Sequence, residues 1–306
     1  MSKIFITGIA GFIGFHTAKK LRALGHEVYG CDNFNQYYDP ELKHERARRL
    51  GLIGVGIWEA DICSQNFPDI EADLVIHLAA MAGVRYSMDH PMEYIQNNIV
   101  GTQMLIENLE RNNVQQVIYA STSCVLHGQE LPWREYETLY PQLNPYGYSK
   151  MLNESQFSMS KIPQAVGIRF FTVYGPYGRP DMALFDFTRS ILADQPITLF
   201  NYGDMKRDFT YVDDIVQGVV LVSENMTDRD IYNLGNGKQV ELKEFVEAIE
   251  LALGKRAIVE YGPKHPADAK ETWSDTSKIE KLGYKSTTPV EEGVKKFVDW
   301  YRGFHK

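Results

Sequence analysis

The sequence predicts an α/β fold in which helices cover both faces of a parallel sheet. Short apolar runs alternate with helical patterns over the first 172 residues, beginning with a strand at 3–7, a glycine-rich turn and a helix to about residue 24. Strands that alternate with helices form parallel sheets, which bind ligands at the carboxyl ends of their strands. With 306 residues, the chain is long enough for one large domain or for a main domain with a smaller lobe.

The composition excludes several other classes of protein. The formal net charge is -8 and the basic residues are scattered, which argues against nucleic acid as the main partner, although a few pocket arginines could still bind an anionic small molecule. No apolar run approaches membrane-spanning length, and the first strand begins too close to the initiator Met for a signal peptide. Cys31, Cys63 and Cys124 lack metal-ligand spacing, so we expect no metal site and a reduced, cytoplasmic setting.

A glycine motif lies between the first strand and the first helix. Residues 8–14 read Gly-Ile-Ala-Gly-Phe-Ile-Gly. Gly8 permits a tight turn, Gly11 lets the backbone approach a pyrophosphate, and Gly14 allows close helix packing, while the helix N-terminus offers amide donors to phosphates. Because the motif has a strand before it and a helix after it, it predicts a Rossmann-type dinucleotide site.

An acidic residue follows the second strand at 27–31. Asp32 stands near the distance from the glycines at which a ribose-binding carboxylate is expected. Such a carboxylate accepts hydrogen bonds from the adenosine 2'-hydroxyl and repels a 2'-phosphate, and no arginine follows it directly. The sequence therefore predicts NAD rather than NADP. The alternative is that Asp32 only starts a turn.

The next elements continue the alternation. His77 interrupts an apolar strand, and we interpret it as a hydrogen-bonded core residue. Asp61 and Ile62 follow the third strand and are positioned to edge the adenine. The arginines of a charged helix at 39–50 are predicted to form a solvated face. Further strands are predicted at 55–59, 74–80 and 116–121, and further helices at 91–112 and 145–161.

Residues 144–150 read Asn-Pro-Tyr-Gly-Tyr-Ser-Lys and carry the predicted chemistry. Tyr146 and Lys150 stand four apart just after a proline that can open a helix, so both side chains lie on one helical face. An adjacent ammonium favours the phenolate and moves the tyrosine pKa from about 10 toward neutrality. Tyr148 meets Leu152 at the same spacing and lacks that neighbour. By spacing alone, the pair could equally be a solvated helix face.

The pattern changes after residue 164. A strand at 165–171 leads into a loop at 172–182 rich in glycine, proline and aromatic residues, and amphipathic helices follow near 242–253 and 290–301. We predict a main domain of residues 1–172 plus returning segments near 207–235, and a smaller C-terminal substrate-binding lobe from the rest of 173–306. Arg179 and Arg207 are candidates for holding an anionic substrate, and the alternative for each is a surface arginine.

Together these motifs resemble the extended short-chain dehydrogenase/reductase family along nearly the whole chain, and more narrowly the UDP-glucuronate 4-epimerases. The finer resemblance rests on the stretches at 32–39, 77–87, 169–182 and 207–214. The third contains Gly-Pro-Tyr-Gly-Arg-Pro-Asp-Met, and the fourth reads Arg-Asp-Phe-Thr-Tyr-Val-Asp-Asp. The chain departs from the family at 124–127, where Cys-Val-Leu-His replaces the usual Ser-Val-Tyr-Gly. This departure bears on sugar selectivity more than on redox chemistry.

The resemblance implies a role for each site residue. Tyr146 would be the catalytic base, Lys150 would bind the nicotinamide ribose, and Ser123 would hydrogen-bond the reacting sugar hydroxyl, with Thr122 as the alternative. NAD is expected to lie against Gly8, Gly11, Phe12, Ile13, Gly14, Asp32, Asn33, Asp61, Ile62, Leu78, Ala79, Ala80, Asn98, Tyr146 and Lys150. The UDP-sugar is expected to lie against Arg85, Ser87, Thr122, Ser123, Thr172, Arg179 and Arg207.

The implied reaction is inversion of C4 of a UDP-sugar, most narrowly UDP-glucuronate to UDP-galacturonate, through a transient 4-keto sugar. Epimerisation of UDP-glucose or UDP-N-acetylglucosamine and decarboxylation of UDP-glucuronate remain alternatives. A non-catalytic NAD sensor or scaffold is an alternative from another class. By resemblance we also expect a homodimer, formed through the helices at 91–112 and 145–161.

Overall fold

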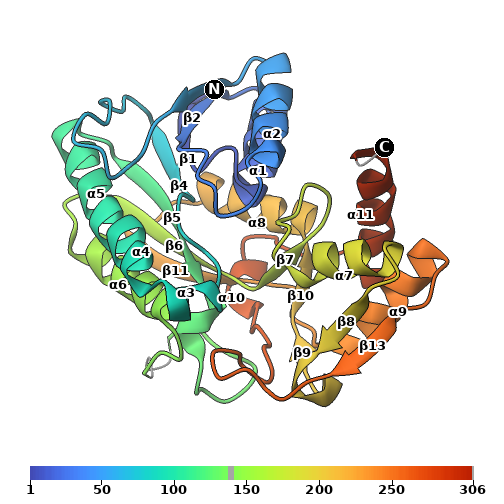
Figure 1. Cartoon of the computed structure of the whole chain (residues 1–306). Helices are drawn as coiled ribbons and strands as arrows, with labels where there is room; N and C mark the ends of the chain where they lie inside the picture. Colours follow the sequence, from blue (N-terminus) through green and yellow to red (C-terminus); the bar gives the residue numbers. More distant parts are fainter. Residues whose placement is uncertain (137–140, 305–306) are drawn as a thin grey trace.

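The computed structural model describes residues 1–136 and 141–304. Its centre is a seven-stranded sheet in the order β11-β6-β5-β4-β1-β2-β3, in which every neighbouring pair is parallel (Figure 1). The strands are β1 (Lys3–Thr7), β2 (Glu27–Asp32), β3 (Gly56–Glu59), β4 (Leu74–His77), β5 (Gln116–Thr122), β6 (Gln164–Phe170) and β11 (Arg229–Leu234). This order is that of a doubly wound sheet, which confirms the predicted fold class.

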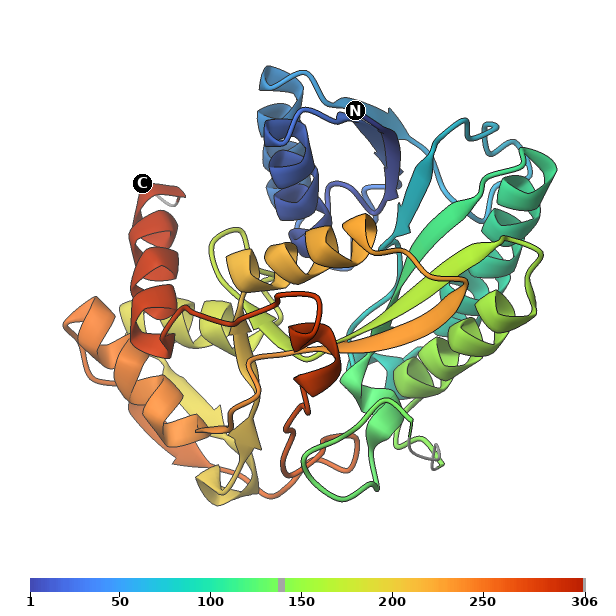
Figure 2. The ribbon, with the colours of Figure 1, turned by 180° about the vertical axis from the view of Figure 1, so that it is seen from behind.

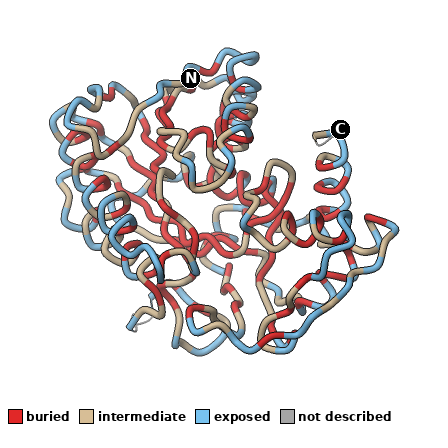
Figure 3. The backbone as a smooth tube through the Cα atoms, viewed as in Figure 1, coloured by how far each residue is buried: buried red, intermediate tan, exposed pale blue. Residues whose placement is uncertain are grey.

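Helices cover both faces of the sheet, as Figures 1 and 2 show from opposite sides. On one face lie α1 (Phe12–Ala23), α2 (Glu41–Leu52) and α8 (Val212–Glu224). On the other lie α5 (Gly101–Arg111) and α6 (Pro145–Met159), preceded by the short α3 (Tyr86–Asp89) and α4 (Pro91–Tyr94). Figure 3 shows buried residues following the central strands, as expected for a sheet covered on both sides.

The chain leaves the main sheet after β6 and builds a second group of elements. These are β7 (Thr172–Tyr174), α7 (Ala183–Leu192), β8 (Pro196–Leu199), β9 (Lys206–Arg207), β10 (Phe209–Tyr211), β12 (Val240–Glu241), α9 (Leu242–Leu253), β13 (Ile258–Tyr261), α10 (Ser277–Glu280) and α11 (Val290–Phe304). The strands form small two-stranded sheets apart from the main one. Between them α8 and β11 return to the main sheet; the domain boundaries themselves stay a prediction.

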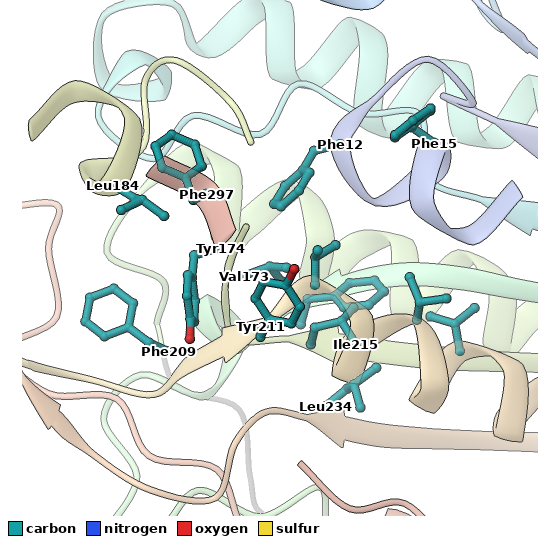
Figure 4. Packing of buried hydrophobic residues seen from close by; sticks show 14 of the residues in the cluster. Phe12, Phe15, Val173, Tyr174, Leu184, Phe209, Tyr211, Ile215, Leu234 and Phe297 are labelled. Carbon is teal, nitrogen blue, oxygen red and sulfur yellow. The ribbon is translucent and has the colours of Figure 1, made fainter. Parts of the chain in front are cut away.

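One apolar cluster joins the two groups of elements. Figure 4 shows Phe12 of α1 between Phe15 of the same helix and Phe297 of α11, with Phe209 of β10 farther along, and all four residues are buried in the same cluster. Because this core is continuous, the main sheet with its helices and the second group of elements pack directly against each other.

The sequence prediction was wrong in its description of two helices. The predicted helix at 91–112 is divided into α4, a π-helical turn η1 (Ile95–Val100) and α5. In α2 the arginines do not all face solvent: Arg46 is fully buried, whereas the side chains of Arg48 and Arg49 are 60% and 48% exposed. Arg46 lies on one helical row with the buried Leu42 and Leu50, at a spacing of four residues.

Candidate active site

A cavity of about 330 Å³ opens where the central strands end. It is lined by residues that directly follow β1, β2, β4, β5 and β6, which is the edge at which doubly wound sheets bind ligands. The predicted site residues that line it are Gly8, Gly11, Phe12, Ile13, Gly14, Asp32, Asn33, Ile62, Leu78, Ala79, Ala80, Thr122, Ser123, Tyr146, Lys150, Thr172 and Arg179.

The glycine turn has the geometry that a dinucleotide requires. Gly8 has a φ of +70°, and a Cβ atom there would lie 2.8 Å from the Ala79 nitrogen. A Cβ on Gly14 would lie 2.2 Å from the Gly8 carbonyl oxygen, so α1 could not pack as closely with any larger residue. Gly11 caps α1, whose first three residues line the cavity. These residues fit a pyrophosphate at the N-terminus of α1.

The ribose side of the cavity contains a cation that the sequence analysis did not identify. Asp32 is buried at the end of β2, and its carboxylate accepts a hydrogen bond of 2.9 Å from the Phe34 amide. Lys43 of α2 lines the cavity with its Nζ 3.8 Å from Asp32 and 2.9 Å from Oδ1 of Asn35. The carboxylate can accept and the ammonium can donate hydrogen bonds, so the pair suits ribose hydroxyls.

The start of α6 aims the two predicted catalytic side chains into the cavity. Asn144 caps the helix by accepting a hydrogen bond of 2.8 Å from the Gly147 amide, and Pro145 occupies its first position. Tyr146 and Lys150 both line the cavity, whereas Tyr148 is 46% exposed on another side of the helix. The structure therefore brings the predicted pair together with the glycine turn.

The pKa values of this pair differ from the sequence expectation. Burial raises the pKa of Tyr146 to about 12, although a hydrogen bond from Thr122 lowers it. Burial also lowers the pKa of Lys150 to about 7, and the nearby Glu154 carboxylate raises it. The expected shift of the tyrosine pKa toward neutrality is absent in the protein alone, because burial outweighs the Thr122 hydrogen bond and the positive charge of Arg179, which both lower that pKa.

The phenol of Tyr146 has a hydroxyl partner in Thr122, the last residue of β5. Thr122 hydrogen-bonds the Tyr146 phenol and also accepts a hydrogen bond of 3.3 Å from the Cys124 amide. Ser123 lines the same cavity one residue later, where the short helix η2 (Ser123–Leu126) begins. Thr122 is thus a hydrogen-bond partner of the tyrosine, and the assignment of Ser123, or alternatively Thr122, to the sugar hydroxyl stays a prediction. The Cys124 thiol group lies beside them on the cavity wall.

Arg179 reaches the cavity from the loop between β7 and α7. Asp181 holds one edge of its guanidinium, with Nε at 3.0 Å from Oδ1 and Nη2 at 2.6 Å from Oδ2. The Tyr37 hydroxyl donates a hydrogen bond of 2.9 Å to the same carboxylate. This arrangement fixes the arginine and leaves its Nη1 group for a ligand. Thr172 lines the cavity nearby.

Two predicted cofactor residues lie outside the cavity lining. The Asp61 carboxylate accepts hydrogen bonds from Asn33 Nδ2 at 2.9 Å and from the Cys63 amide at 2.8 Å. Asn98 is fully buried in the π-helical turn, where its amide bonds both the amide and the carbonyl of Met81. Both residues support the walls of the cavity, because their polar groups are used by neighbouring protein segments.

Three predicted substrate residues also lie outside the cavity lining. The Ser87 hydroxyl donates to the Val84 carbonyl at 2.6 Å. Arg85 pairs with Asp268 at 2.7 Å. Arg207 donates to backbone carbonyls at 2.7 to 2.9 Å, and these belong to residues 206, 269 and 270. Each of these three side chains therefore has a polar partner within the protein, which a sequence pattern does not reveal.

His77 has the structural role predicted from the sequence. Its Nδ1 lies 2.8 Å from the Thr7 hydroxyl and its Nε2 lies 3.0 Å from the Thr102 hydroxyl, and burial lowers its pKa to about 3.

Within residues 1–136 and 141–304, no group of three or more acidic, histidine or cysteine side chains could hold a metal ion. None of the helices in the same described residues is long and apolar enough to span a bilayer.

The parallel sheet, the glycine turn and a cavity lined by Tyr146 and Lys150 are the features of a dinucleotide-dependent enzyme. The profile of the NAD dependent epimerase/dehydratase family matches residues 4–235, and the chain belongs to that family. It is 41% identical over 333 residues to protein CapI of Staphylococcus aureus, with 99% of each chain covered.

Two further comparisons narrow the resemblance. The chain is 37% identical over 312 residues to the UDP-glucuronate 4-epimerase of Thermodesulfobacterium geofontis, covering 98% of this chain and 96% of the relative. Its fold is similar to a crystal structure of the Bacillus cereus UDP-glucuronic acid 4-epimerase in complex with UDP-glucuronic acid and NAD. That match has a TM-score of 0.91 and 33% identity, and it covers 99% of each chain. These findings confirm the family resemblance drawn from the sequence.

Proposed function

We propose that this chain is an NAD-dependent enzyme that inverts C4 of UDP-glucuronate to give UDP-galacturonate. One observation carries the proposal: Thr122, Tyr146, Lys150 and Arg179 line the same cavity as the glycine turn and Asp32. The relatives named as UDP-glucuronate 4-epimerases support it along nearly the whole chain. We also infer a cytoplasmic enzyme, because Cys31, Cys63 and Cys124 are free.

The residues of the chain move the proton and hold the sugar. When bound, NAD supplies an acceptor for the hydride of C4, a donor for its return, and a positive ring while oxidised. The Tyr146 oxygen accepts the proton of the C4 hydroxyl and later returns it, while the Thr122 hydroxyl orients the phenol. The protonated ammonium of Lys150 stabilises the Tyr146 phenolate. The Glu154 carboxylate favours that protonated form of the lysine.

Arg179 is assigned to the carboxylate of the sugar. A 4-keto sugar with a carboxylate on C5 is a β-keto acid and tends to lose carbon dioxide, so an epimerase must hold that carboxylate away from the geometry for cleavage. Arg179 is fixed on one edge by Asp181 and faces the cavity with its other edge. A rigid guanidinium fork suits this task because it binds carboxylate oxygens in a defined plane.

The substrate is tested by incubating the purified protein with UDP-glucuronate, UDP-glucose and UDP-N-acetylglucosamine and separating products by anion exchange. We expect UDP-galacturonate from the first and little turnover of the neutral sugars.

Arg179→Lys should raise the KM for UDP-glucuronate by about tenfold or more, with some decarboxylated pentose product. Arg189→Lys, which changes a 57% exposed arginine in the same lobe, is the control. Turnover of only a neutral UDP-hexose would instead favour a 4-epimerase of UDP-glucose or UDP-N-acetylglucosamine, in line with the departure from the family pattern at residues 124–127.

We further propose a homodimer formed through α4, η1 and α6. Met92, Ile95 and Val100 are 69%, 37% and 38% exposed, and Tyr148 and Met159 of the adjoining α6 are 46% and 77% exposed. The two segments contact each other, so these apolar side chains belong to neighbouring elements. A second copy of the same helices would bury them in a four-helix bundle.

A further inference from the structure

We propose that Arg46 is a positioning residue that links the glycine turn to the loop carrying Arg179, so that NAD and the UDP-sugar bind cooperatively. The proposal rests on the function proposed above, because it takes the glycine turn as the NAD site and Arg179 as a sugar contact. Arg46 does not line the cavity, so it would contact neither ligand directly. It would act through the backbone of both ligand sites.

The contacts of Arg46 join three segments that are distant in sequence. Its Nη1 donates to the Ala10 carbonyl at 2.9 Å and to the Tyr38 hydroxyl at 2.7 Å. Its Nη2 donates to the Tyr177 carbonyl at 2.6 Å. Ala10 lies inside the glycine turn, and Tyr177 stands two residues before Arg179. One buried guanidinium therefore braces the backbone of both ligand sites.

The charge of Arg46 is buried without a carboxylate. Among the described residues, no acidic side chain forms a salt bridge with it, and its Nε has no hydrogen-bond partner. An unpaired buried charge is costly, and carbonyl dipoles and a phenol offset only part of that cost. A pyrophosphate held by the glycine turn would supply the missing negative charge. Bound NAD should therefore stabilise the charged Arg46 and, with it, the contact to Tyr177.

The loop that Arg46 holds needs external support. Gly175 has a φ of +146° and Tyr177 has a φ of +59°, a conformation that side-chain-bearing residues rarely adopt. The Pro176 carbonyl accepts a hydrogen bond of 2.9 Å from His16 Nε2 of α1, and the Tyr177 ring packs 4.8 Å from those of Phe15 and Trp300. Without Arg46 the Tyr177 carbonyl would lose its donor, and Arg179 would lose its fixed approach to the cavity.

The far end of the loop is tied to the same part of the cofactor half. Tyr37 donates to Asp181, which holds Arg179, and the adjacent Tyr38 accepts from Arg46. Asp32 ends β2 and Lys43 lies in the first turn of α2, so the two residues flank the segment that carries Tyr37 and Tyr38. Occupation of the ribose site should thus restrain both ends of the Arg179 loop. By linkage, the sugar must then tighten NAD by the same factor by which NAD tightens the sugar.

The test measures this linkage by calorimetry. NAD is titrated into NAD-free protein with and without saturating UDP-glucuronate, in a Tyr146→Phe background that prevents turnover. We expect UDP-glucuronate to increase the affinity of the parent protein for NAD by about tenfold, a typical coupling factor. Arg46→Met should reduce that factor to about one and should also weaken NAD binding in the absence of the sugar. Arg46→Lys should retain more NAD affinity through its charge but lose the coupling, because one ammonium cannot reproduce the planar fork that reaches both carbonyls.

The matched control is Arg49→Met. Arg49 lies on the same helix and its guanidinium is 5.3 Å from the Tyr177 ring, but it is 48% exposed and does not donate to Ala10. Its substitution should leave the coupling factor unchanged. An Arg46→Met or Arg46→Lys protein that is less heat-stable yet keeps full coupling would make Arg46 merely structural and overturn the proposal, as would a parent protein without coupling. If the parent binds only a neutral UDP-sugar, the proposed substrate fails, and the same titrations with that sugar still decide the role of Arg46.

Discussion

Tyr146 and Lys150 occupy a buried site in which the protein alone disfavours the charged form of each. Burial raises the pKa of Tyr146 to about 12 and lowers that of Lys150 to about 7. A phenol that is neutral in the resting protein does not act as a base until more positive charge reaches the cavity. We therefore predict that proton removal by Tyr146 depends on the positive charge of the bound cofactor.

The buried lysine should leave a signature in the stability of the NAD-free protein. Its pKa is about 7 in the folded protein, against about 10.5 in the unfolded chain. Below pH 7 both states carry the proton, so the folded state bears the full cost of a buried charge; above pH 7 the unfolded state binds more protons, so stability rises with pH. Lys150→Met should therefore raise Tm most near pH 6 and least near pH 10, measured by thermal scans. An increment that is equal at both pH values would contradict this account.

The two candidate hydroxyls at the end of β5 can be separated by paired substitutions. Thr122 hydrogen-bonds Tyr146, so Thr122→Ala should lower kcat by about a hundredfold, a typical loss for a positioned proton-transfer group. Ser123→Ala keeps that hydrogen bond and should cost less than about tenfold. Steady-state rates with UDP-glucuronate measure both. The opposite order would restore the serine assignment made from the sequence.

Residues in local motifs could be located from the sequence, whereas residues defined by long-range contacts could not. Two local motifs have spacings that a strand, a turn or a helix sets: the glycines with Asp32, and Tyr146 with Lys150. The placement of these residues at the cavity was therefore predictable. The placement of Arg85 and Arg207 near the sugar came from resemblance and stays a prediction, whereas their contacts with Asp268 and with backbone carbonyls join distant segments and could not be predicted from spacing. Arg46 was missed because a charge-rich helix suggests a solvated face; its position on the row of Leu42 and Leu50 was the available signal.

At the scale of elements, the connection from β1 to α1 determines the cofactor site. A Cβ on Gly14 would meet backbone atoms of residues 8 and 9 at 2.2 to 3.1 Å. Backbone cannot move aside as a flexible side chain can, so any side chain at this position must displace the helix from the turn.

Gly14→Ala should therefore lower Tm and abolish detectable NAD binding. The matched control is Gly51→Ala in α2, where a Cβ would meet nothing within 4 Å. That change should leave NAD binding intact and stabilise the protein by up to about 1 kcal/mol, because alanine is the better helix former. Thermal scans and NAD titration of both variants provide the measurement. A Gly14→Ala protein with normal NAD affinity would refute the close-packing argument.

Element types were more predictable than element details. The predicted strand at 3–7 and the predicted helix at 242–253 coincide with β1 and α9. The π-helical turn at Ile95–Val100 was not predicted, because the apolar spacing on either side is that of an ordinary helix and the turn is held by Asn98 bonding Met81. Such contacts between distant segments leave no periodic signal in the sequence.

At the scale of the whole molecule, the apolar surface of α4, η1 and α6 makes a dimer the expected state. Introducing a carboxylate there, as Met92→Glu with Met159→Glu, should give monomers in light scattering after size exclusion, because it would place charges in a buried bundle. Leu251→Glu alters an apolar residue that is 78% exposed on α9 of the smaller lobe and should leave the dimer intact. A monomeric parent protein would reject the proposed interface.

The most direct test of the account is the rate of C4 epimerisation in Tyr146→Phe, measured on protein shown to retain NAD. Removal of the phenol oxygen should reduce interconversion of UDP-glucuronate and UDP-galacturonate by about a thousandfold or more, within the range for loss of a proton-transfer group, and leave the fold unchanged. A Tyr146→Phe enzyme that interconverts the two sugars at the parental rate would contradict the assignment of the proton carrier and the function built on it.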